Sequence, residues 1–214
     1  MDLEETCELD KELSSVDSIS RIKKVYSLSD KILMLTSGGA KYPVVPHLFK
    51  KALPGVKISI LFIDIECYNE ETYLAVNSLS QDGNEVKIYR PKISLKMDEA
   101  LYGKTHFEKI NEMNKEIYKS WCRRRKEEPL SRAINEIKPD FLAGGRTLFQ
   151  SSKRNDIKCL EKRGSLFQFN PIFDWNDKKI FDYMKENNLS GNTAHFDPTK
   201  DYDDGECPIW FYEI

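Results

Sequence analysis

Short apolar runs alternate along the chain with longer segments whose apolar residues recur at helical spacing. The runs predict buried strands over residues 31–36, 58–64, 85–89 and 140–143. Helical spacing follows them over residues 45–53, 70–79, 129–137 and 174–184. Strands that alternate with helices are typical of a parallel sheet with crossover helices. The pattern therefore predicts an α/β fold with a mainly parallel sheet.

The two ends of the chain and one internal stretch are more polar. Residues 3–27 carry apolar positions at close to helical spacing, which predicts one leading helix. Residues 92–118 are lysine-rich and predict further helix without clear limits. The helix that opens near residue 174 is capped by Asp174 or Asn176. The expected parts are an N-terminal helical segment (1–28), a main α/β domain (29–190) and a C-terminal tail (191–214).

Composition excludes several classes of protein. The 214 residues include 33 Lys and Arg against 35 Asp and Glu, a net charge of -2, which argues against a general nucleic-acid binder. No window approaches eighteen consecutive apolar residues, and the first ten residues are acidic where a signal peptide would be basic and then apolar. We expect a soluble, cytoplasmic protein without a membrane partner.

The charges are unevenly distributed along the chain. Residues 119–163 hold thirteen Lys and Arg against six Asp and Glu. Residues 1–20 hold seven acids and one lysine, and residues 197–214 hold six acids and one lysine. This segregation indicates a cationic crevice for an anionic ligand between acidic ends.

The five cysteines stand at positions 7, 67, 122, 159 and 207. Their number is odd, they are widely spaced, and no Cys-x-x-Cys motif occurs. Neither a disulfide framework nor a structural zinc site is therefore encoded, and we expect reduced thiols.

A glycine-containing loop follows the first predicted strand. Thr36, Ser37, Gly38, Gly39, Ala40 and Lys41 occupy this strand-to-helix turn. Glycines let backbone amides converge, the helix start adds partial positive charge, and the Ser37 hydroxyl adds a donor, so the loop suits a phosphate. An ordinary strand-to-helix turn is the alternative.

Other polar residues lie where later strands end. Asp64 and Glu66 follow the second strand, where carboxylates could meet a ribose, a base edge or Mg²⁺. Four consecutive cations, residues 123–126, precede the helix at Pro129 and could clamp an anion, although a solvated surface is the alternative. A further strand ends in a glycine pair that is followed by two candidate anion-binding arginines: Gly144, Gly145, Arg146 and Arg154.

The order and spacing of six motifs resemble the phosphoadenylyl-sulfate reductase family, part of the PP-loop group of adenine-nucleotide enzymes. The motifs are Ser37-Gly38-Gly39, Phe62-Ile63-Asp64 with Glu71-Thr72-Tyr73, Tyr89-Arg90-Pro91, residues 125–130 with Arg132-Ala133, Ala143-Gly144-Gly145-Arg146 with Gln150-Ser151-Ser152 and Arg154, and residues 170–175. The resemblance runs from about residue 30 to residue 207. It implies a Rossmann-like three-layer α/β/α sandwich with an adenine nucleotide in its crevice.

The chain also differs from the family pattern. Lys41-Tyr42 stand where the PP-loop has Asp-Ser. The family's reductases carry a Glu-Cys-Gly-Leu-His segment whose cysteine attacks the sulfate sulfur, and here only Glu206-Cys207 is similar. Iron–sulfur relatives have a Cys-Cys pair and a Cys-x-x-Cys, of which Cys122 and Cys207 remain. Because such a cluster needs four thiolates, we do not expect one.

The resemblance implies that Cys122 and Cys207 lie near each other beside the nucleotide crevice. The cations at 123–126 would lower the pKa of the Cys122 thiol. One thiol could then carry a persulfide that the other resolves as a disulfide. The alternative is that neither cysteine takes part in catalysis.

These features lead to a first hypothesis, an enzyme of sulfur metabolism that adenylates an acceptor for sulfur transfer. Ser37 to Lys41 would hold the phosphates, and Asp64 and Glu66 would meet the ribose, base or metal. The negative charge that develops in the transition state would be stabilised by Arg125, Lys126, Arg146 and Arg154. The cofactor would be ATP, AMP or an adenylyl sulfate, with Mg²⁺ as a further candidate.

The expected partners are a small-molecule or carrier-bound acceptor, a sulfur donor or thioredoxin-like protein, and a second copy of the chain. Two other hypotheses remain open. One is a thioredoxin-dependent reductase of adenylyl sulfates that uses Cys207 as nucleophile and releases sulfite. The other is a nucleotide-binding regulatory protein without turnover.

Overall fold

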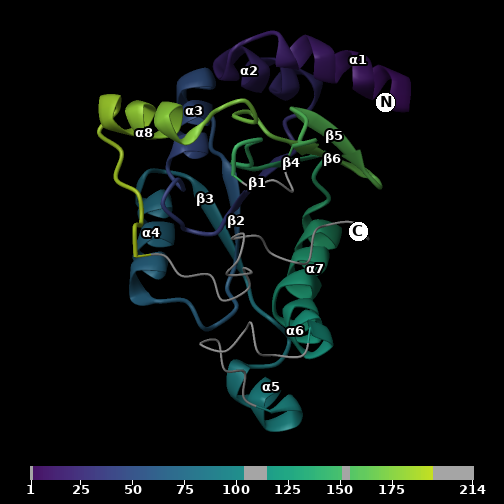
Figure 1. The fold of residues 1–214 in the computed structure, drawn as a ribbon, viewed down its shortest axis with the longest axis vertical. Coiled ribbons are helices and arrows are strands. Elements are labelled where there is room, and N and C mark those ends of the chain that lie inside the picture. The colour runs from purple at the N-terminus through teal and green to yellow at the C-terminus, as the bar shows by residue number, and fades with distance from the viewer. Residues whose placement is uncertain (1, 104–114, 151–154, 195–214) are drawn as a thin grey trace.

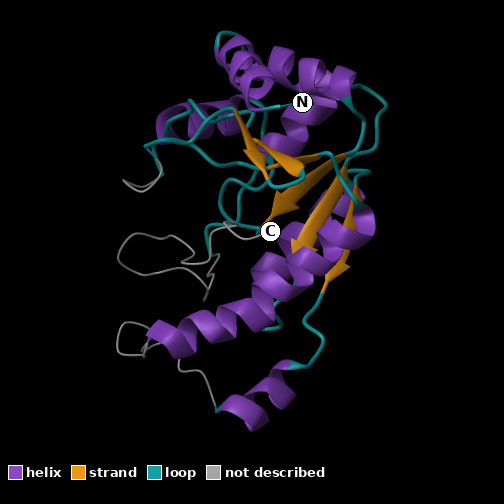
Figure 2. Ribbon diagram, turned by 90° about the vertical axis from the view of Figure 1, so that its right-hand side faces the viewer, coloured by secondary structure: helices purple, strands orange, loops and turns teal. Residues whose placement is uncertain are grey.

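A six-stranded sheet forms the centre of the molecule in the computed structural model, which describes residues 2–103, 115–150 and 155–194 (Figures 1 and 2). The strands are β1 (Ile32–Thr36), β2 (Ser59–Ile63), β3 (Glu85–Tyr89), β4 (Phe141–Ala143), β5 (Leu160–Arg163) and β6 (Leu166–Phe169). Their order across the sheet is β3-β2-β1-β4-β6-β5. Every pair is parallel except β5 with β6. The predicted mainly parallel α/β sheet is confirmed.

Helices cover both faces of this sheet. They are α1 (Leu3–Ser14), α2 (Ser18–Leu28), α3 (Val44–Ala52), α4 (Glu70–Gln81), α5 (Leu95–Tyr102), α6 (Lys115–Cys122), the π-helical η2 (Arg123–Glu127), α7 (Glu128–Ile137) and α8 (Asp177–Glu186). Figure 1 shows α3 and α8 on one side of the strands and α6 and α7 on the other.

Alternation along the buried strands produces two hydrophobic cores. Ile32 and Met34 of β1 pack with α2, α3 and α8, whereas Leu33 between them packs with α6 and α7. Successive side chains of a strand point to opposite faces, so each strand contributes to both cores. This arrangement is the three-layer sandwich that the sequence predicts.

The chain reverses its direction across the sheet next to β1. From β1 it proceeds outward through β2 to β3, and β4 then returns to pair with the other side of β1. Open parallel sheets bind ligands where the strand order reverses, outside the carboxyl ends of the strands. The loops after β1 and β4 meet at that point.

Two local features of the structure differ from the sequence prediction, and one choice that the sequence left open is decided. Residues 3–27 form two helices, because Asp17 accepts hydrogen bonds from the backbone of Ile19 and Ser20 and so starts a second helix. Of the two caps predicted for the last helix, Asp174 or Asn176, the structure confirms Asn176 for α8. The β5–β6 hairpin has no counterpart in the sequence prediction, because β5 is a charged edge strand, Leu160-Glu-Lys-Arg163, without an apolar run.

The lysine-rich stretch at residues 92–118 contains α5 and the start of α6 within its described part. Residues 104–114 fall outside the described residues. No helix in the described ranges is both long enough and apolar enough to span a lipid bilayer.

Candidate functional site

The loop from Ser37 to Lys41 leaves β1 at its carboxyl end and leads into α3. Gly38 has a φ of 69°, and a Cβ at this position would lie 3.0 Å from Thr72 Cγ2 and 3.1 Å from the Thr72 carbonyl oxygen. A left-handed backbone conformation pressed against α4 requires glycine. Gly38 N–H donates to Thr36 Oγ1 over 3.1 Å, which closes the first turn of the loop.

Backbone donors in this loop are available to a ligand. Among the described residues, no acceptor is found for the N–H groups of Ser37, Gly39 and Ala40. Backbone amides that are grouped in a loop before a helix and lack an acceptor of their own form a site for an anion such as phosphate or sulfate. The geometry thus supports the phosphate-binding interpretation of this loop.

Lys41 is turned toward α8. Its Nζ lies 2.5 Å from Asp177 Oδ1, at the first residue of that helix. The Lys41 side chain is about a quarter exposed, and Asp177 is mostly exposed. The ion pair links the glycine loop to α8, so a contact of Lys41 with a phosphate requires this pair to open.

Asp64 follows β2 and is 3% exposed. Its carboxylate accepts hydrogen bonds from Tyr73 OH (2.8 Å), Arg90 Nε (2.8 Å) and the backbone of Glu66 (2.9 Å). Burial and the bond to Asp64 raise the pKa of the Tyr73 hydroxyl, which therefore remains a donor at neutral pH. Asp64 organises this strand end, and its predicted contact with ribose, base or metal stays a prediction.

Glu66 has a left-handed backbone, with a φ of 64°. Its Oε2 accepts from the backbone N–H of Leu95 (2.7 Å) and from Arg125 Nη2 (2.6 Å). The fully buried Arg125 also donates to the carbonyl oxygens of Ile65 and Ile93. Both side chains therefore brace the end of β2 against the segment before α5. The ligand contacts predicted for Glu66 and Arg125 stay predictions. Such contacts would compete with the hydrogen bonds that the two side chains already make inside the protein.

The cationic run at 123–126 forms η2, between α6 and α7. Successive side chains here take different environments: Arg125 is buried, Arg124 pairs with Asp98 over 2.6 Å, and Lys126 is half-buried. Cys122, just before η2, is fully buried in the core beside Trp121. A thiolate at Cys122, which the sequence predicts, can meet a substrate only when this core opens. The catalytic role of Cys122 therefore stays a prediction.

The second glycine pair follows β4 at the other side of the strand reversal. Gly144 is buried beside Gln168, and a Cβ on Gly145 would contact Val45 in the first turn of α3. Half-buried Arg146 comes next in the chain. The structure therefore brings the loops after β1 and β4 to one edge, as predicted. Arg154 and Cys207 lie outside the described residues.

The segment after α8 also contacts the glycine loop, which sequence reasoning missed. Asn192, 8% exposed, donates to the Gly38 carbonyl over 3.0 Å and to Thr72 Oγ1 over 3.2 Å. Gly191 approaches the Ala40 carbonyl so closely that a Cβ would lie 1.8 Å from its oxygen. The sequence signal is a Gly-Asn pair in a polar stretch, which also fits any surface turn.

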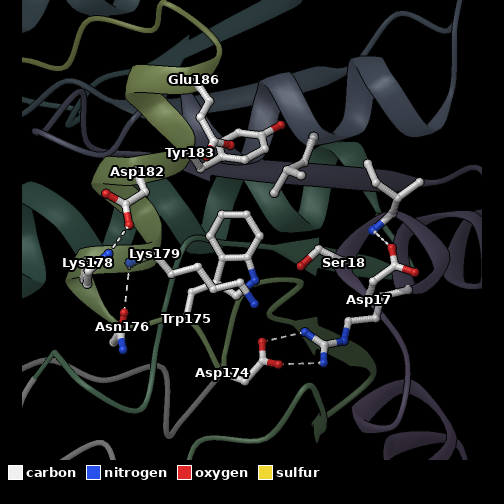
Figure 3. A pocket seen from close by; sticks show the side chains of 13 residues that line it. Asp17, Ser18, Asp174, Trp175, Asn176, Lys178, Lys179, Asp182, Tyr183 and Glu186 are labelled. Atoms are coloured by element: carbon white, nitrogen blue, oxygen red, sulfur yellow. Dashed lines mark hydrogen bonds and ion pairs between the residues drawn. The ribbon is translucent and has the colours of Figure 1, made fainter.

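A separate cavity of about 610 Å³ lies among α2, α3 and α8 (Figure 3). Its lining includes Trp175, Tyr183 and Ser18, and it contains none of the predicted site residues. Asp174 points at Arg21 along one wall. The cavity belongs to the helical layer, whereas the candidate site lies at the carboxyl ends of the strands.

Comparison with known proteins identifies the family. The model of the phosphoadenosine phosphosulfate reductase domain matches residues 31–197, from the start of β1 to beyond the Asn192 segment. The chain belongs to this family. The predicted resemblance is thereby confirmed, and the glycine loop, the strand-end acids and the Gly144-Gly145 loop all fall inside the matched region.

Individual relatives agree with this assignment. A phosphoadenosine 5'-phosphosulfate reductase from Buchnera aphidicola is 31% identical over 192 residues, covering 89% of this chain and 76% of the relative. One from Pectobacterium carotovorum is 29% identical over 165 residues, and the match spans 77% of this chain but only 65% of the relative. The phosphoadenylyl-sulfate reductase of Candida auris, solved as a phosphate complex, shares the fold with a TM-score of 0.74, 19% identity and 91% of each chain covered.

Proposed function

We propose that the protein binds an adenylyl sulfate at the edge where the loops after β1 and β4 meet, and reduces it to sulfite. The observation that carries this proposal is the set of amides at Ser37, Gly39 and Ala40, which have no acceptor in the described part of the chain and lie at the strand reversal of a reductase-family fold. Sulfate and phosphate oxygens are the acceptors that such amides bind. The relatives named as reductases of phosphoadenosine phosphosulfate support this choice of substrate over ATP.

In this proposal each loop has a distinct task. The glycine loop binds an anionic group of the nucleotide, and Arg146 supplies a positive charge from the loop after β4. Arg154 and Lys126 are further candidates for charge stabilisation. Asp64 and Glu66, held by Arg90 and Arg125, shape the edge on which the ribose or base lies.

Cys207 is the proposed nucleophile. Its thiolate attacks the sulfur of the sulfate, the bond from sulfur to the bridging phosphate oxygen breaks, and the nucleotide leaves with that oxygen. The cysteine then carries an S-sulfo group. A dithiol protein of the thioredoxin type supplies two electrons, becomes a disulfide and releases sulfite, which restores the thiol.

Sulfite release from adenosine 5'-phosphosulfate and its 3'-phosphorylated form, with a reduced thioredoxin, tests this function. Wild-type protein is expected to release one sulfite for each nucleotide consumed. The rate of sulfite release by Cys207→Ser is expected to fall below about a thousandth of the wild-type rate, since a serine cannot form the S-sulfo intermediate. Cys7→Ser, which changes an exposed thiol on α1, is the matched control with unchanged rate. Full activity of Cys207→Ser would contradict the assigned role.

A second candidate, adenylation of an acceptor for sulfur transfer, is favoured by the lysine at position 41. A cation in this loop, paired with Asp177 in the absence of ligand, could contact the phosphates of ATP when that pair opens. Pyrophosphate released from ATP only when an acceptor is present would support this candidate. Tight binding of ATP or AMP without turnover of any of these substrates would indicate a nucleotide-binding regulatory protein.

A further inference from the structure

The segment from Gly191 to Ala194 crosses the glycine loop and ends at the start of α4. Asn192 Nδ2 donates to the Gly38 carbonyl and to Thr72 Oγ1, and its Oδ1 accepts from the backbone N–H of Ala194 over 3.1 Å. Asn69 Nδ2 in turn donates to the Ala194 carbonyl over 2.6 Å. One buried amide thus joins the glycine loop, α4 and the end of the described chain.

The Gly38 carbonyl belongs to the same peptide unit as the Gly39 N–H. In a trans peptide these two groups point in opposite directions, and no cis bond occurs in the described residues. Asn192 holds the carbonyl on its own side, so the Gly39 N–H points away from Asn192. That N–H is one of the loop donors without a described partner.

Glycine on both sides of this peptide makes its orientation easy to change. Neither residue has a Cβ that would restrict rotation of the peptide plane, so the loop sequence does not fix the direction of the Gly39 donor. Among the described residues, Asn192 is the donor that holds the carbonyl oxygen of this peptide. Asn192 binds the carbonyl side of this peptide, and an anion would bind its N–H side. Both therefore favour the same conformation of the loop.

We propose that Asn192 is a positioning residue that orients the Gly38–Gly39 peptide so that the Gly39 N–H donates to the sulfate or phosphate of the ligand. This inference rests on the proposed function, because it requires an anionic nucleotide in the loop. It adds a coupling: occupation of the loop and seating of residues 191–194 stabilise each other, as linkage requires.

Binding of adenosine 3',5'-bisphosphate, a ligand that cannot turn over, tests the inference. Asn192→Ala removes the donor to Gly38, and the dissociation constant measured by calorimetry is expected to rise about tenfold, the size of one net hydrogen bond. Asn192→Asp keeps the shape and the acceptor for Ala194 but places an oxygen against the Gly38 carbonyl, so the expected rise is larger, about a hundredfold. The predicted order of affinity is wild type first, then Asn192→Ala, then Asn192→Asp.

The matched control is Asn84→Ala. Asn84 Nδ2 also donates to a backbone carbonyl, that of Leu79 over 2.9 Å, but it lies just before β3, at the opposite edge of the sheet. Loss of this bond is expected to lower the thermal midpoint as much as Asn192→Ala does, while leaving the dissociation constant unchanged. A purely structural role for Asn192 predicts that both variants behave alike.

The amide of Gly39 gives a direct readout. In ¹⁵N-labelled wild-type protein its NMR signal is expected to shift when the bisphosphate is added, and this shift is expected to shrink in both Asn192 variants. If wild-type protein binds neither adenosine 3',5'-bisphosphate nor adenosine 5'-phosphosulfate, the proposed function fails. If it binds, and the folded Asn192→Asp variant binds equally with the same Gly39 shift, the positioning role is overturned.

Discussion

Arg21 shows how a single side chain can hold distant parts of this fold together. It is 1% exposed, donates to the carbonyl oxygens of Leu13 and Pro171, and forms two hydrogen bonds with the Asp174 carboxylate. The guanidinium also lies 4.7 Å from the ring centre of Phe173. A buried charge is tolerated when it is paired and fully hydrogen-bonded. Arg21 thus ties the α1–α2 corner to the loop before α8.

The Arg21–Asp174 pair predicts a specific pH dependence of stability. Burial alone raises the pKa of Asp174, but the hydrogen bonds and charge of Arg21 outweigh it, so the folded pKa lies below the ordinary value. The pair therefore stabilises the protein above about pH 4, and this stability is lost as the pH falls through the folded pKa. Asp174→Asn is expected to cost about 1–2 kcal/mol at pH 7, a value reduced for the partial exposure of Asp174.

Urea unfolding of wild type and Asp174→Asn at pH 7, 5 and 3 measures this effect. The difference in unfolding free energy should be largest at pH 7 and shrink toward pH 3. The control Asp182→Asn removes the exposed pair with Lys178, and no resolvable change in unfolding free energy is expected because solvent screens this pair. A difference for Asp174→Asn that stays constant over this pH range would show that the ion pair is not the source of stability.

At the scale of elements, the continuous run α6–η2–α7 explains how one cationic stretch serves several purposes. A π-turn inserts residues into the helix and rotates the side chains that follow. Arg125 then points inward to Glu66, while Arg124 pairs with Asp98 of α5. The run therefore braces two neighbouring segments and leaves fewer free cations than its sequence predicts.

The glycine loop and α4 form a second coupled pair of elements, and Gly38→Ala tests their contact. A side chain at Gly38 is strained by its positive φ and also lies 3.0 Å from Thr72 Cγ2. We expect a loss of about 2–4 kcal/mol in stability from strain and overpacking together, and weaker nucleotide binding. Thermal unfolding and calorimetric titration with adenosine 3',5'-bisphosphate measure the two effects.

Gly83→Ala separates strain from packing. Gly83 has a comparable positive φ of 88°, but a Cβ there meets nothing within 4 Å. Strain alone is expected to cost about 1–2 kcal/mol, with nucleotide affinity unchanged. Equal losses of stability in the two variants would mean that the contact with α4 contributes little.

At the scale of the whole molecule, the N-terminal helices share the core of the sheet domain. Leu13, Ile22 and Val25 are fully buried in the same cluster as residues of α3, β1 and α8. Asp10 also accepts a hydrogen bond from the backbone of Leu160 in β5. The helices therefore cover one face of the sheet and belong to the same core.

Removal of residues 2–28 tests this dependence. The truncation exposes the apolar surfaces of α3, α8 and β5 and removes the partner of Asp174, so we expect the cooperative thermal transition and the near-ultraviolet circular dichroism to be lost. The same measurement on a chain shortened only by residues 2–5, whose side chains are exposed, should give a near-native transition. A cooperative transition with an unchanged midpoint after the longer truncation would contradict a shared core.

The sequence by itself determined the strands β1 to β4, the helices α3, α4, α7 and α8, the glycine loop after β1, the second loop after β4 and the family. These features depend on local periodicity, on turn residues and on motifs in order along the chain. The charged edge strand β5 was missed because its residues lack that local signal.

Only the tertiary structure decided which side chains face the ligand and which hold the protein together. Arg125 and Glu66 are bonded across 59 positions, Lys41 and Asp177 across 136, and Asn192 and Gly38 across 154. A charged or amide side chain has the same local pattern whether it binds a ligand or a distant partner. Its role is decided by the neighbours that the fold brings within hydrogen-bonding distance, and those neighbours are set by the packing of the sheet and its helices.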